Sequence, residues 1–371
     1  MTAGRSGDKT IRVLLVSDQL VETSEQQFAP LLRNSRTLRD RFGVVVRTAS
    51  VDQALGPVPL KLDQFHIVGL KLSFRTSPAE ALAIVEKMRQ GIEGAGTRFV
   101  YFDGDDDLNI QWPEVLRRVD LYVKKHVYSD PAAYTRTYIG KSNLTDHVAR
   151  THNVSFENDI IPASGSLSLA DTAKIHLGWN IGLDDKIVEL LDTHQLDIVK
   201  KKSIDVTCRA AVPASFWTYG LRTPAVDALE RLSGRFRIKS PKTRVSQSEY
   251  HAELERSMIC VSPFGFGEIC WRDFEAVLFG CMIVKPDMGH VRTAPDIFER
   301  GVTYAAVKWD YSDLEEVCAY YLANEEIRLQ VVQNARQRLL SALRPDWIAD
   351  RFGDLLAATG TIDEPKRIAA I

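Results

Sequence analysis

The stretch from Ser262 to Pro286, SPFGFGEICWRDFEAVLFGCMIVKP, decides the fold class. It follows an apolar run that ends at Val261 and is typical of a buried strand. The chain then turns through Gly265 and Gly267, enters a helical stretch closed by Gly280, and continues into a second apolar strand. A strand, a glycine turn, a helix and a further strand make one half of a nucleotide-binding α/β unit.

The residue types in this segment suit the binding of a diphosphate. Glycines let backbone N–H groups approach an anion closely, and a helix N-terminus adds partial positive charge at the same place. Arg272 can make a bidentate contact with a diphosphate, and Glu275 lies where it can accept hydrogen bonds from ribose hydroxyls. The plainer interpretation is an ordinary strand-to-helix joint that carries a surface ion pair.

Apolar runs alternate with helix-like stretches on both sides of this segment, which indicates parallel sheets with right-handed crossovers. The runs are IRVLLVSD (11–18), VVVRTAS (44–50), FHIVGLKLS (65–73), TRFVYFDGDDD (97–107), DLYVKKHVY (120–128), SIDVTCRAA (203–211), FRIKSP (236–241), MICVSP (258–263) and TYAAVKWD (303–310). A chain of 371 residues is long enough for two domains. We therefore expect α/β domains over residues 1–190 and 191–345, and a C-terminal helix and tail over 346–371.

The glycine segment resembles the donor-binding region of GT-B glycosyltransferases, and its spacing resembles the exostosin-type members. Those carry a P-x-G-x-G-like turn, an arginine, a W-E-A or V-E-A helix start and a G-C-x-P-V strand entry. The matching residues here are Pro263 to Gly267, Arg272, Phe274 to Ala276 and Gly280 to Val284. Ile283 stands where the family has proline, and Glu268 and Glu275 are seven positions apart rather than eight.

The resemblance implies two Rossmann-like domains facing a cleft, with the acceptor on the first, the donor on the second, and a helix around Trp347–Leu356 crossing back to the first. It implies a glycosyltransferase that moves a sugar from a nucleotide-sugar donor to a hydroxyl of a glycan or glycolipid, without a cofactor or a required divalent metal. The arginine of the motif contacts the diphosphate in that family, and the glutamate the nucleoside sugar. The candidate donor-binding residues are Arg209, Ser262, Gly265, Gly267, Glu268, Arg272, Glu275 and His290.

An acidic cluster, YFDGDDD, follows a predicted strand of the first half, where ligands of open α/β sheets gather. Asp103 and Asp105 are the candidates for a general base that deprotonates the acceptor, since crowded carboxylates have raised pKa values. Two alternatives are a Mg²⁺ or Mn²⁺ site and a solvated loop that caps the next helix. Lys71 and Lys124 also follow strands and are candidate acceptor contacts, or ordinary exposed cations.

The composition narrows the class of protein further. The net charge is −2, with 45% hydrophobic residues, so nothing favours nucleic acid as a partner. No apolar run approaches the length of a membrane span, although peripheral membrane contact stays open. The five cysteines form no CxxC pair and lie mostly among apolar neighbours, which favours a reducing, cytoplasmic location and no metal site. An epimerase-like enzyme and a non-catalytic nucleotide-sugar-binding module remain as alternatives. The sugar, the nucleotide, the stereochemistry and the oligomeric state are not determined.

Overall fold

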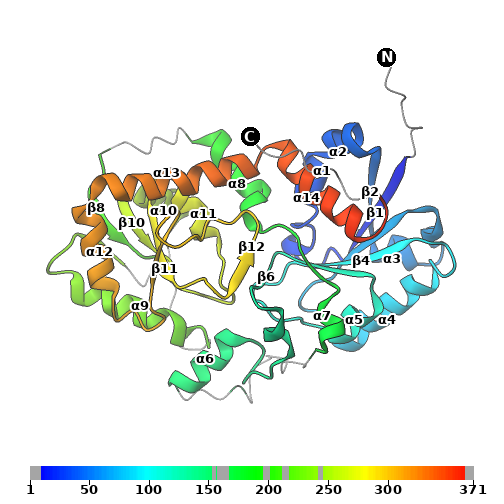
Figure 1. The fold of residues 1–371 in the computed structure, drawn as a ribbon, viewed down its shortest axis with the longest axis horizontal. Coiled ribbons are helices and arrows are strands. Elements are labelled where there is room, and N and C mark those ends of the chain that lie inside the picture. Colours follow the sequence, from blue (N-terminus) through cyan, green and yellow to red (C-terminus); the bar gives the residue numbers. More distant parts are fainter. Residues whose placement is uncertain are drawn as a thin grey trace.

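The computed structural model describes residues 10–152, 156, 167–194, 201–210, 217–240 and 245–363. These residues form two α/β units side by side, each built on a parallel sheet (Figure 1). The first sheet has six strands in the order β2-β1-β3-β4-β5-β7, and the second has five in the order β13-β11-β10-β8-β9. The predicted fold class, α/β with two Rossmann-like domains, is confirmed.

In the first unit, short buried strands alternate with helices that cover both faces of the sheet, as continuous apolar strands require. The strands are β1 (Ile11–Ser17), β2 (Val44–Ser50), β3 (Ile67–Lys71), β4 (Arg98–Asp103), β5 (Leu121–Lys124) and β7 (Ile175–Leu177). The helices are η1 (Glu22–Ser24), α1 (Ala29–Arg33), α2 (Ser35–Phe42), α3 (Val51–Leu55), η2 (Leu62–Gln64), α4 (Pro78–Gln90) and α5 (Pro113–Arg118). Ser77 accepts a hydrogen bond from the backbone N–H of Glu80 and so caps α4, as its sequence predicts.

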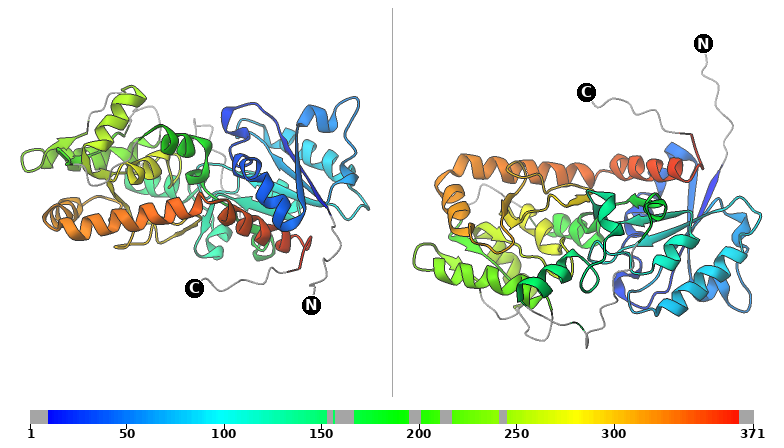
Figure 2. Two further views of the ribbon diagram at one scale, coloured as in Figure 1. Left: turned by 90° about the horizontal axis from the view of Figure 1, so that it is seen from above. Right: turned by 60° about the horizontal axis from the view of Figure 1, so that its bottom comes forward.

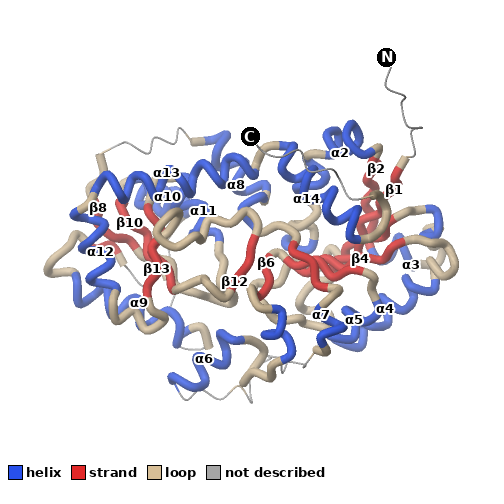
Figure 3. Tube along the Cα trace, in the orientation of Figure 1, coloured by secondary structure: helices blue, strands red, loops and turns tan. Residues whose placement is uncertain are grey.

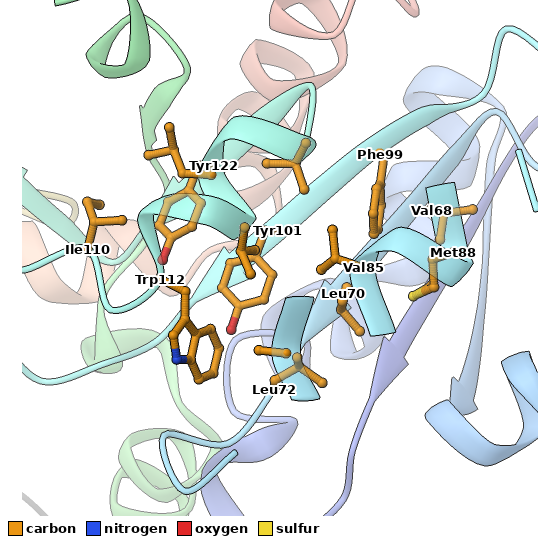
Figure 4. Close-up of a cluster of buried hydrophobic side chains, with 14 of the residues drawn as sticks. Val68, Leu70, Leu72, Val85, Met88, Phe99, Tyr101, Ile110, Trp112 and Tyr122 are labelled. Atoms are coloured by element: carbon orange, nitrogen blue, oxygen red, sulfur yellow. The ribbon is translucent and has the colours of Figure 1, made fainter. Parts of the chain in front are cut away.

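The first sheet has a hydrophobic layer on each face. On one face, strand residues pack with α3, α4 and α5, and Tyr101 stacks on Tyr122 at 5.1 Å between ring centroids, beside Trp112 (Figure 4). On the other face, residues of β1 such as Val13 pack with α1, α2 and the C-terminal helix. The strands of this sheet, and the polar residues at their ends, are therefore held by packing on both faces.

The second unit repeats this plan. Its strands are β8 (Ile204–Thr207), β9 (Ile238–Lys239), β10 (Ser257–Val261), β11 (Met282–Pro286) and β13 (Ala305–Val307). Its helices are α8 (Asp185–Thr193), α9 (Tyr219–Leu232), α10 (Gln247–Glu255), α11 (Trp271–Leu278), α12 (Leu314–Ala323) and α13 (Glu325–Ala342). The strand, glycine turn, helix and strand predicted for 258–286 are β10, the turn, α11 and β11.

Several short elements lie outside the two sheets: β6 (His126–Tyr128), η3 (Pro131–Thr135), α6 (Asn143–His152), α7 (Leu169–Thr172), η4 (Ile181–Leu183) and β12 (Val291–Thr293). The run 120–128 forms two strands, because the chain leaves the sheet after Lys124 and β6 pairs antiparallel with β12. This β6–β12 ribbon lies between the two sheets (Figure 3). Neither β7 nor β12, of three residues each, was predicted.

The C-terminal helix α14 (Pro345–Ala358) continues from α13 and packs against α2 of the first unit (Figure 2). This confirms the predicted return of the chain to the first domain. The predicted division between residues 190 and 191 lies inside α8, whose Ile187 and Leu190 pack in the core beside the second sheet. The boundaries themselves stay a prediction.

Candidate functional site

The glycine turn joins β10 to α11 and is held from beneath by a buried polar cluster. The Ser262 hydroxyl donates to Asp273 at 2.6 Å, and the Lys285 ammonium donates to the same carboxylate at 3.1 Å. All three side chains are fully buried. Asp273 also accepts the backbone N–H of Cys270 at 2.9 Å, which begins the helix. Ser262, predicted as a donor contact, therefore supports the turn from below.

Both glycines of the turn have close neighbours, and Gly267 meets backbone atoms. A Cβ atom at position 267 would lie 1.4 Å from the carbonyl oxygen of Asp106, so the turn touches the acidic loop of the first unit directly. A Cβ atom at position 265 would lie 2.6 Å from Nη2 of Arg222 in α9. The glycine turn and the acidic cluster, predicted separately from the sequence, thus meet at one place.

Two arginines converge on the turn. Arg272 Nη1 lies 3.4 Å from the Ser262 hydroxyl, and Arg222 lies over Gly265. Burial, followed by the positive charge of Arg272, lowers the pKa of Arg222. Like charges drawn together in a half-buried place favour the binding of an anion between them. Nothing in the sequence distinguished Arg222 from an ordinary surface arginine of a helix.

Two other predicted donor contacts have protein partners. Arg209 forms a hydrogen-bonded ion pair at 2.5 Å with Glu253, a carboxylate that also accepts the Thr207 hydroxyl at 2.6 Å. Glu275 accepts a hydrogen bond from Gln247 at 3.3 Å and lies 3.6 Å from Nε2 of His251. Both lie beside α10 in the second unit, where a ligand would have to compete with these partners.

Glu268, the residue that follows the turn, is fully buried between the two units. Its carboxylate accepts the Asn143 amide at 3.2 Å and lies 3.3 Å from Nε2 of His290 and 3.6 Å from Nε2 of His126. Burial raises the pKa of Glu268, but hydrogen bonding to His126 and His290 outweighs it and holds the pKa well below its usual range. Glu268 therefore ties the turn to the first unit, and His290 is its partner from the loop before β12.

In the acidic cluster, the first carboxylate is enclosed. Asp103 accepts hydrogen bonds from the Lys124 ammonium and the Tyr122 hydroxyl, both at 2.8 Å, and is 2% exposed. Burial raises the pKa of Asp103, but Lys124 and Lys71 outweigh that effect and lower it. Lys124 is fully buried, so its ammonium contacts the acidic cluster from the protein interior and is not exposed to solvent.

Asp105 has a different environment. Its side chain is 17% exposed, and its nearest cation is the Lys71 ammonium at 3.9 Å. Burial and the neighbouring Asp103 charge raise the pKa of Asp105 to about 6. Lys71 is itself buried and donates to the carbonyl of Leu72 at 2.8 Å. The two lysines predicted to contact the acceptor are thus internal partners of the acidic cluster.

The last two carboxylates of the cluster are each paired with a lysine. Asp106 lies 2.9 Å from the Lys125 ammonium, and Asp107 lies 2.8 Å from that of Lys141. Across the part of the chain that the structure describes, no three or more histidine, cysteine or acidic side chains are grouped so that they would hold a metal ion. No helix in that part is both long and apolar enough to cross a membrane.

Most of the second unit is similar to a known family of proteins. Residues 222–354 match a family model described as glycosyl transferase-like. No curated protein sequence matches the chain. The HepE protein of Anabaena, in complex with UDP-glucose, is similar in structure at 10% identity and a TM-score of 0.46, over 94% of this chain and 100% of that one.

Two further solved structures are similar over nearly the whole chain. A glycosyltransferase from Rickettsia africae is 10% identical with a TM-score of 0.49, over 95% of this chain and 99% of that one. A UDP-forming α,α-trehalose-phosphate synthase from Burkholderia vietnamiensis is 12% identical with a TM-score of 0.47, over 95% and 100%. At such identities the similarity is one of fold alone.

The region that matches the glycosyl transferase-like model contains the glycine turn and both arginines beside it, whereas Arg209 precedes it. It begins at Arg222 and includes the glycine turn, Arg272 and most of α14. The acidic loop that meets the turn comes from outside this region. The site therefore combines a cationic side in the matched region with a carboxylate of raised pKa in the first unit.

Proposed function

We propose that the protein is a glycosyltransferase that moves a sugar from a nucleotide-sugar donor to a hydroxyl of a glycan or glycolipid acceptor. The observation that carries this proposal is the contact of Gly267 with Asp106, which brings the glycine turn and its two arginines against the acidic loop that contains Asp105. An anionic leaving group and an acceptor hydroxyl would meet there. We also propose that the protein is related to the exostosin-type glycosyltransferases, because the glycine turn has their spacing.

The donor diphosphate would lie against Arg222, Arg272 and the backbone amides of the turn. These groups stabilise negative charge that develops on the departing diphosphate as the bond to the sugar breaks. Because guanidinium groups already supply positive charge there, we propose that no divalent metal is required. Glu275 lies one helical turn beyond Arg272, and we keep it as the contact for the nucleoside ribose.

Asp105 would take the proton of the acceptor hydroxyl as the new glycosidic bond forms. A base with a pKa near 6 is mostly deprotonated at neutral pH and still basic enough to accept a proton. We place the acceptor on the first domain for this reason. We also propose a cytoplasmic location, which the five free cysteines support, four of them buried.

The test is a thermal-shift and calorimetric screen with UDP, GDP, CMP, dTDP and NAD, with and without Mg²⁺. A ligand at about 100 times its Kd stabilises the folded state by about 2.7 kcal/mol. We expect one of the non-NAD nucleotides to raise the Tm whether or not Mg²⁺ is present. Arg272→Ala and Arg222→Ala should each weaken binding by about 10- to 100-fold, the loss of one charge-assisted contact.

Arg231→Ala is the matched control, since Arg231 is an exposed arginine in the last turn of the same helix as Arg222. It should bind the nucleotide as the unaltered protein does. A shift with NAD alone, or with none of the nucleotides, would contradict the proposal. Release of nucleoside diphosphate that depends on an added acceptor separates transfer from an epimerase-like isomerisation.

A further inference from the structure

His290 contacts the glycine turn on both sides of its two glycines. Its ring packs on that of Phe264, just before Gly265, at 6.2 Å between centroids. Its Nε2 atom lies 3.3 Å from Oε1 of Glu268, just after Gly267. The backbone amides proposed to hold the donor diphosphate lie between these two contacts in the chain. A diphosphate bound at the turn would therefore lie close to this imidazole.

The position of the His290 ring is fixed by neighbours from other elements. The ring of Trp309, which follows β13, is 5.2 Å from it between centroids. Ser129, which follows β6, donates its backbone N–H to the carbonyl of His290 and its hydroxyl to the carbonyl of Gly289, both at 2.9 Å. The imidazole is thus held in place without a ligand, which lowers the cost of ordering it when a ligand binds.

One ring nitrogen of His290 is open to a ligand. Nε2 faces Glu268, whereas Nδ1 makes no hydrogen bond to the residues that the structure describes. The side chain is 25% exposed, and Nδ1 is not one of the described polar atoms that are buried without a partner. Solvent therefore reaches Nδ1, and so can a bound molecule.

Glu268 determines which nitrogen of the neutral ring carries the proton. Burial raises the pKa of Glu268, but hydrogen bonding to His126 and His290 outweighs burial and keeps it well below its usual range, so the carboxylate is ionised. An ionised carboxylate only accepts hydrogen bonds, so Nε2 of His290 is the nitrogen that carries the proton. Nδ1 of the neutral ring then has a lone pair and no proton.

A diphosphate oxygen is also an acceptor, so it cannot form a hydrogen bond with an unprotonated Nδ1. The contact requires a second proton on the ring, which gives His290 a positive charge. A carboxylate at one nitrogen and a diphosphate at the other both favour this charged form. An ordinary histidine is mostly neutral at pH 7.5, so the proton would come from the solvent as the nucleotide binds.

We propose that His290 binds the donor diphosphate as an imidazolium, a third positive group beside Arg222 and Arg272, and takes up its proton when the nucleotide binds. The inference rests on the proposed function, because it needs a diphosphate at the turn. It adds to that function a coupling between donor binding and pH. The alternative is a neutral His290 that accepts a hydroxyl of the donor sugar, which takes up no proton.

The other titratable groups around His290 are kept neutral by burial or already carry their charge. They are His126 of β6, Tyr128 of β6, His147 of α6, Lys285 of β11, and Asp287 and Asp310 of the loops after β11 and β13. Burial lowers the pKa of the two histidines and raises that of the tyrosine, so all three stay neutral. Lys285 pairs with Asp273 at 3.1 Å. Asp287 lies 3.6 Å from Arg300, and the backbone N–H of Ser312 lowers the pKa of Asp310. We therefore expect the uptake to occur at His290.

The test is isothermal titration calorimetry of the full chain with UDP, GDP and dTDP at pH 7.5, in PIPES, HEPES and Tris. The dependence of the binding enthalpy on the ionisation enthalpy of the buffer gives the number of protons taken up. We expect about 0.5 to 1 proton for each nucleotide bound, the range for one histidine that becomes charged. His290→Gln should take up about none, while its amide can still donate to Glu268.

The Kd at two pH values is a second measurement. At pH 6.5 the unaltered protein should bind the nucleotide about 10-fold more tightly than His290→Gln, the effect of one charge-assisted hydrogen bond. At pH 9 the two should bind about equally, because the imidazole is then neutral. His66→Gln is the matched control, since His66 precedes β3, at the end opposite the acidic loop, and accepts the backbone N–H of Arg12 at 3.0 Å. It should match the unaltered protein at both pH values.

Nucleotide binding without proton uptake would overturn the role of His290 and leave the proposed function in place. That result needs no variant, so it does not depend on how well His290→Gln folds. Equal uptake by His290→Gln would also overturn the role, because another group would then gain the proton. Absence of binding by all three nucleotides would overturn both this inference and the proposed function.

Discussion

Asp103 and Asp105 lie two positions apart in the acidic loop, yet their pKa values move in opposite directions. Asp103 is enclosed by Lys124 and Tyr122, and the positive charges of Lys124 and Lys71 hold it ionised. Asp105 is farther from a cation and carries the repulsion of Asp103, which together with burial raises its pKa to about 6. One carboxylate is thus structural, and the other is suited to accept a proton.

We expect Asp105→Asn to lower kcat by about 100- to 10,000-fold, the usual range for removal of a general base. Nucleotide affinity should be unchanged, because the proposed donor contacts are Arg222, Arg272 and the backbone amides of the turn rather than Asp105. In the unaltered protein, kcat should fall below about pH 6 as Asp105 becomes protonated. The measurement is kcat from pH 5 to 8 together with the nucleotide Kd.

The same variant should be more stable than the unaltered protein at pH 8. The folded pKa of Asp105 lies above its unfolded value, so the folded state binds the extra proton at low pH and carries an unfavourable charge above about pH 6. Asparagine removes that charge, and the Tm should rise. Asp106→Asn is the control for kcat, since Asp106 is a more exposed neighbour paired with Lys125. A kcat within about 3-fold of the unaltered value in Asp105→Asn would exclude Asp105 as the base.

At the scale of the element, the turn between β10 and α11 depends on contacts from both units. Gly267 lies on the backbone of the acidic loop, and Glu268 lies between His126 and His290. The turn is therefore an interdomain contact as well as part of the proposed donor site. Changes in it should affect stability and nucleotide binding together.

Gly267→Ala should weaken nucleotide binding by at least about 10-fold and destabilise the fold by about 1–3 kcal/mol, the usual cost of overpacking. The reason is that the new methyl group would lie 1.4 Å from backbone that cannot rotate away. Gly265→Ala should do less, because its methyl meets the flexible end of Arg222. Gly234→Ala, with open space around it, should be neutral. Calorimetry and thermal melts of the three variants check the order, and equal effects at 265 and 267 would contradict the geometry.

Glu268→Gln should be less stable than the unaltered protein by about 1–3 kcal/mol at pH 7.5, since a buried charged partner of His126 and His290 is lost. The folded pKa of Glu268 is depressed, so its contribution is present above the unfolded pKa and declines as the pH falls towards the folded one. The stability difference between the two proteins should therefore shrink below about pH 4.5. Urea titrations at pH 7.5 and pH 4 measure it, and a difference that is constant with pH would argue against an ionised Glu268.

These elements also show what sequence patterns predict and what they miss. The strand, glycine turn and helix around Gly265 and Gly267 were predictable, because their causes lie within one short stretch of chain. The partners of Glu268 were not, since Asn143 is 125 positions away, and neither was Arg222 above Gly265. Likewise Lys124 has the pattern of an exposed strand end, and only the packing of the acidic loop over it accounts for its burial. Local patterns predict elements, whereas the pairing of charges depends on how distant elements pack.

At the scale of the whole molecule, the two units are interleaved. Leu144 and Val148 of α6, early in the chain, pack in the same core as Phe274 of α11. Phe352 of α14, late in the chain, packs in the core of the first sheet beside Val13. The contact between the glycine turn and the acidic loop therefore depends on the segments that set the angle between the units.

Asn180, just before η4, is a buried residue that holds these segments together through hydrogen bonds. It is 2% exposed. Its amide donates to the Thr293 hydroxyl at 2.7 Å and to the carbonyl of Pro295 at 2.9 Å, and its carbonyl oxygen accepts the N–H of Gly182 at 2.9 Å. Asn180→Ala would leave these buried groups unpaired, at about 1–3 kcal/mol for each that finds no water. Because Thr293 belongs to β12, the loss would loosen the β6–β12 ribbon where the units meet.

We therefore expect Asn180→Ala to lower the Tm by about 5–10 °C, to increase the radius of gyration, and to weaken nucleotide binding, while the circular dichroism spectrum stays unchanged. The control is Asn334→Ala, because Asn334 donates to the carbonyl of Val302 at 3.0 Å entirely within the second unit. That variant should lose some stability and keep both the scattering profile and the nucleotide Kd. If Asn180→Ala kept them as well, the angle between the units would not depend on this residue. The donor site would then be complete within the second unit, because its affinity would not need the acidic loop in place.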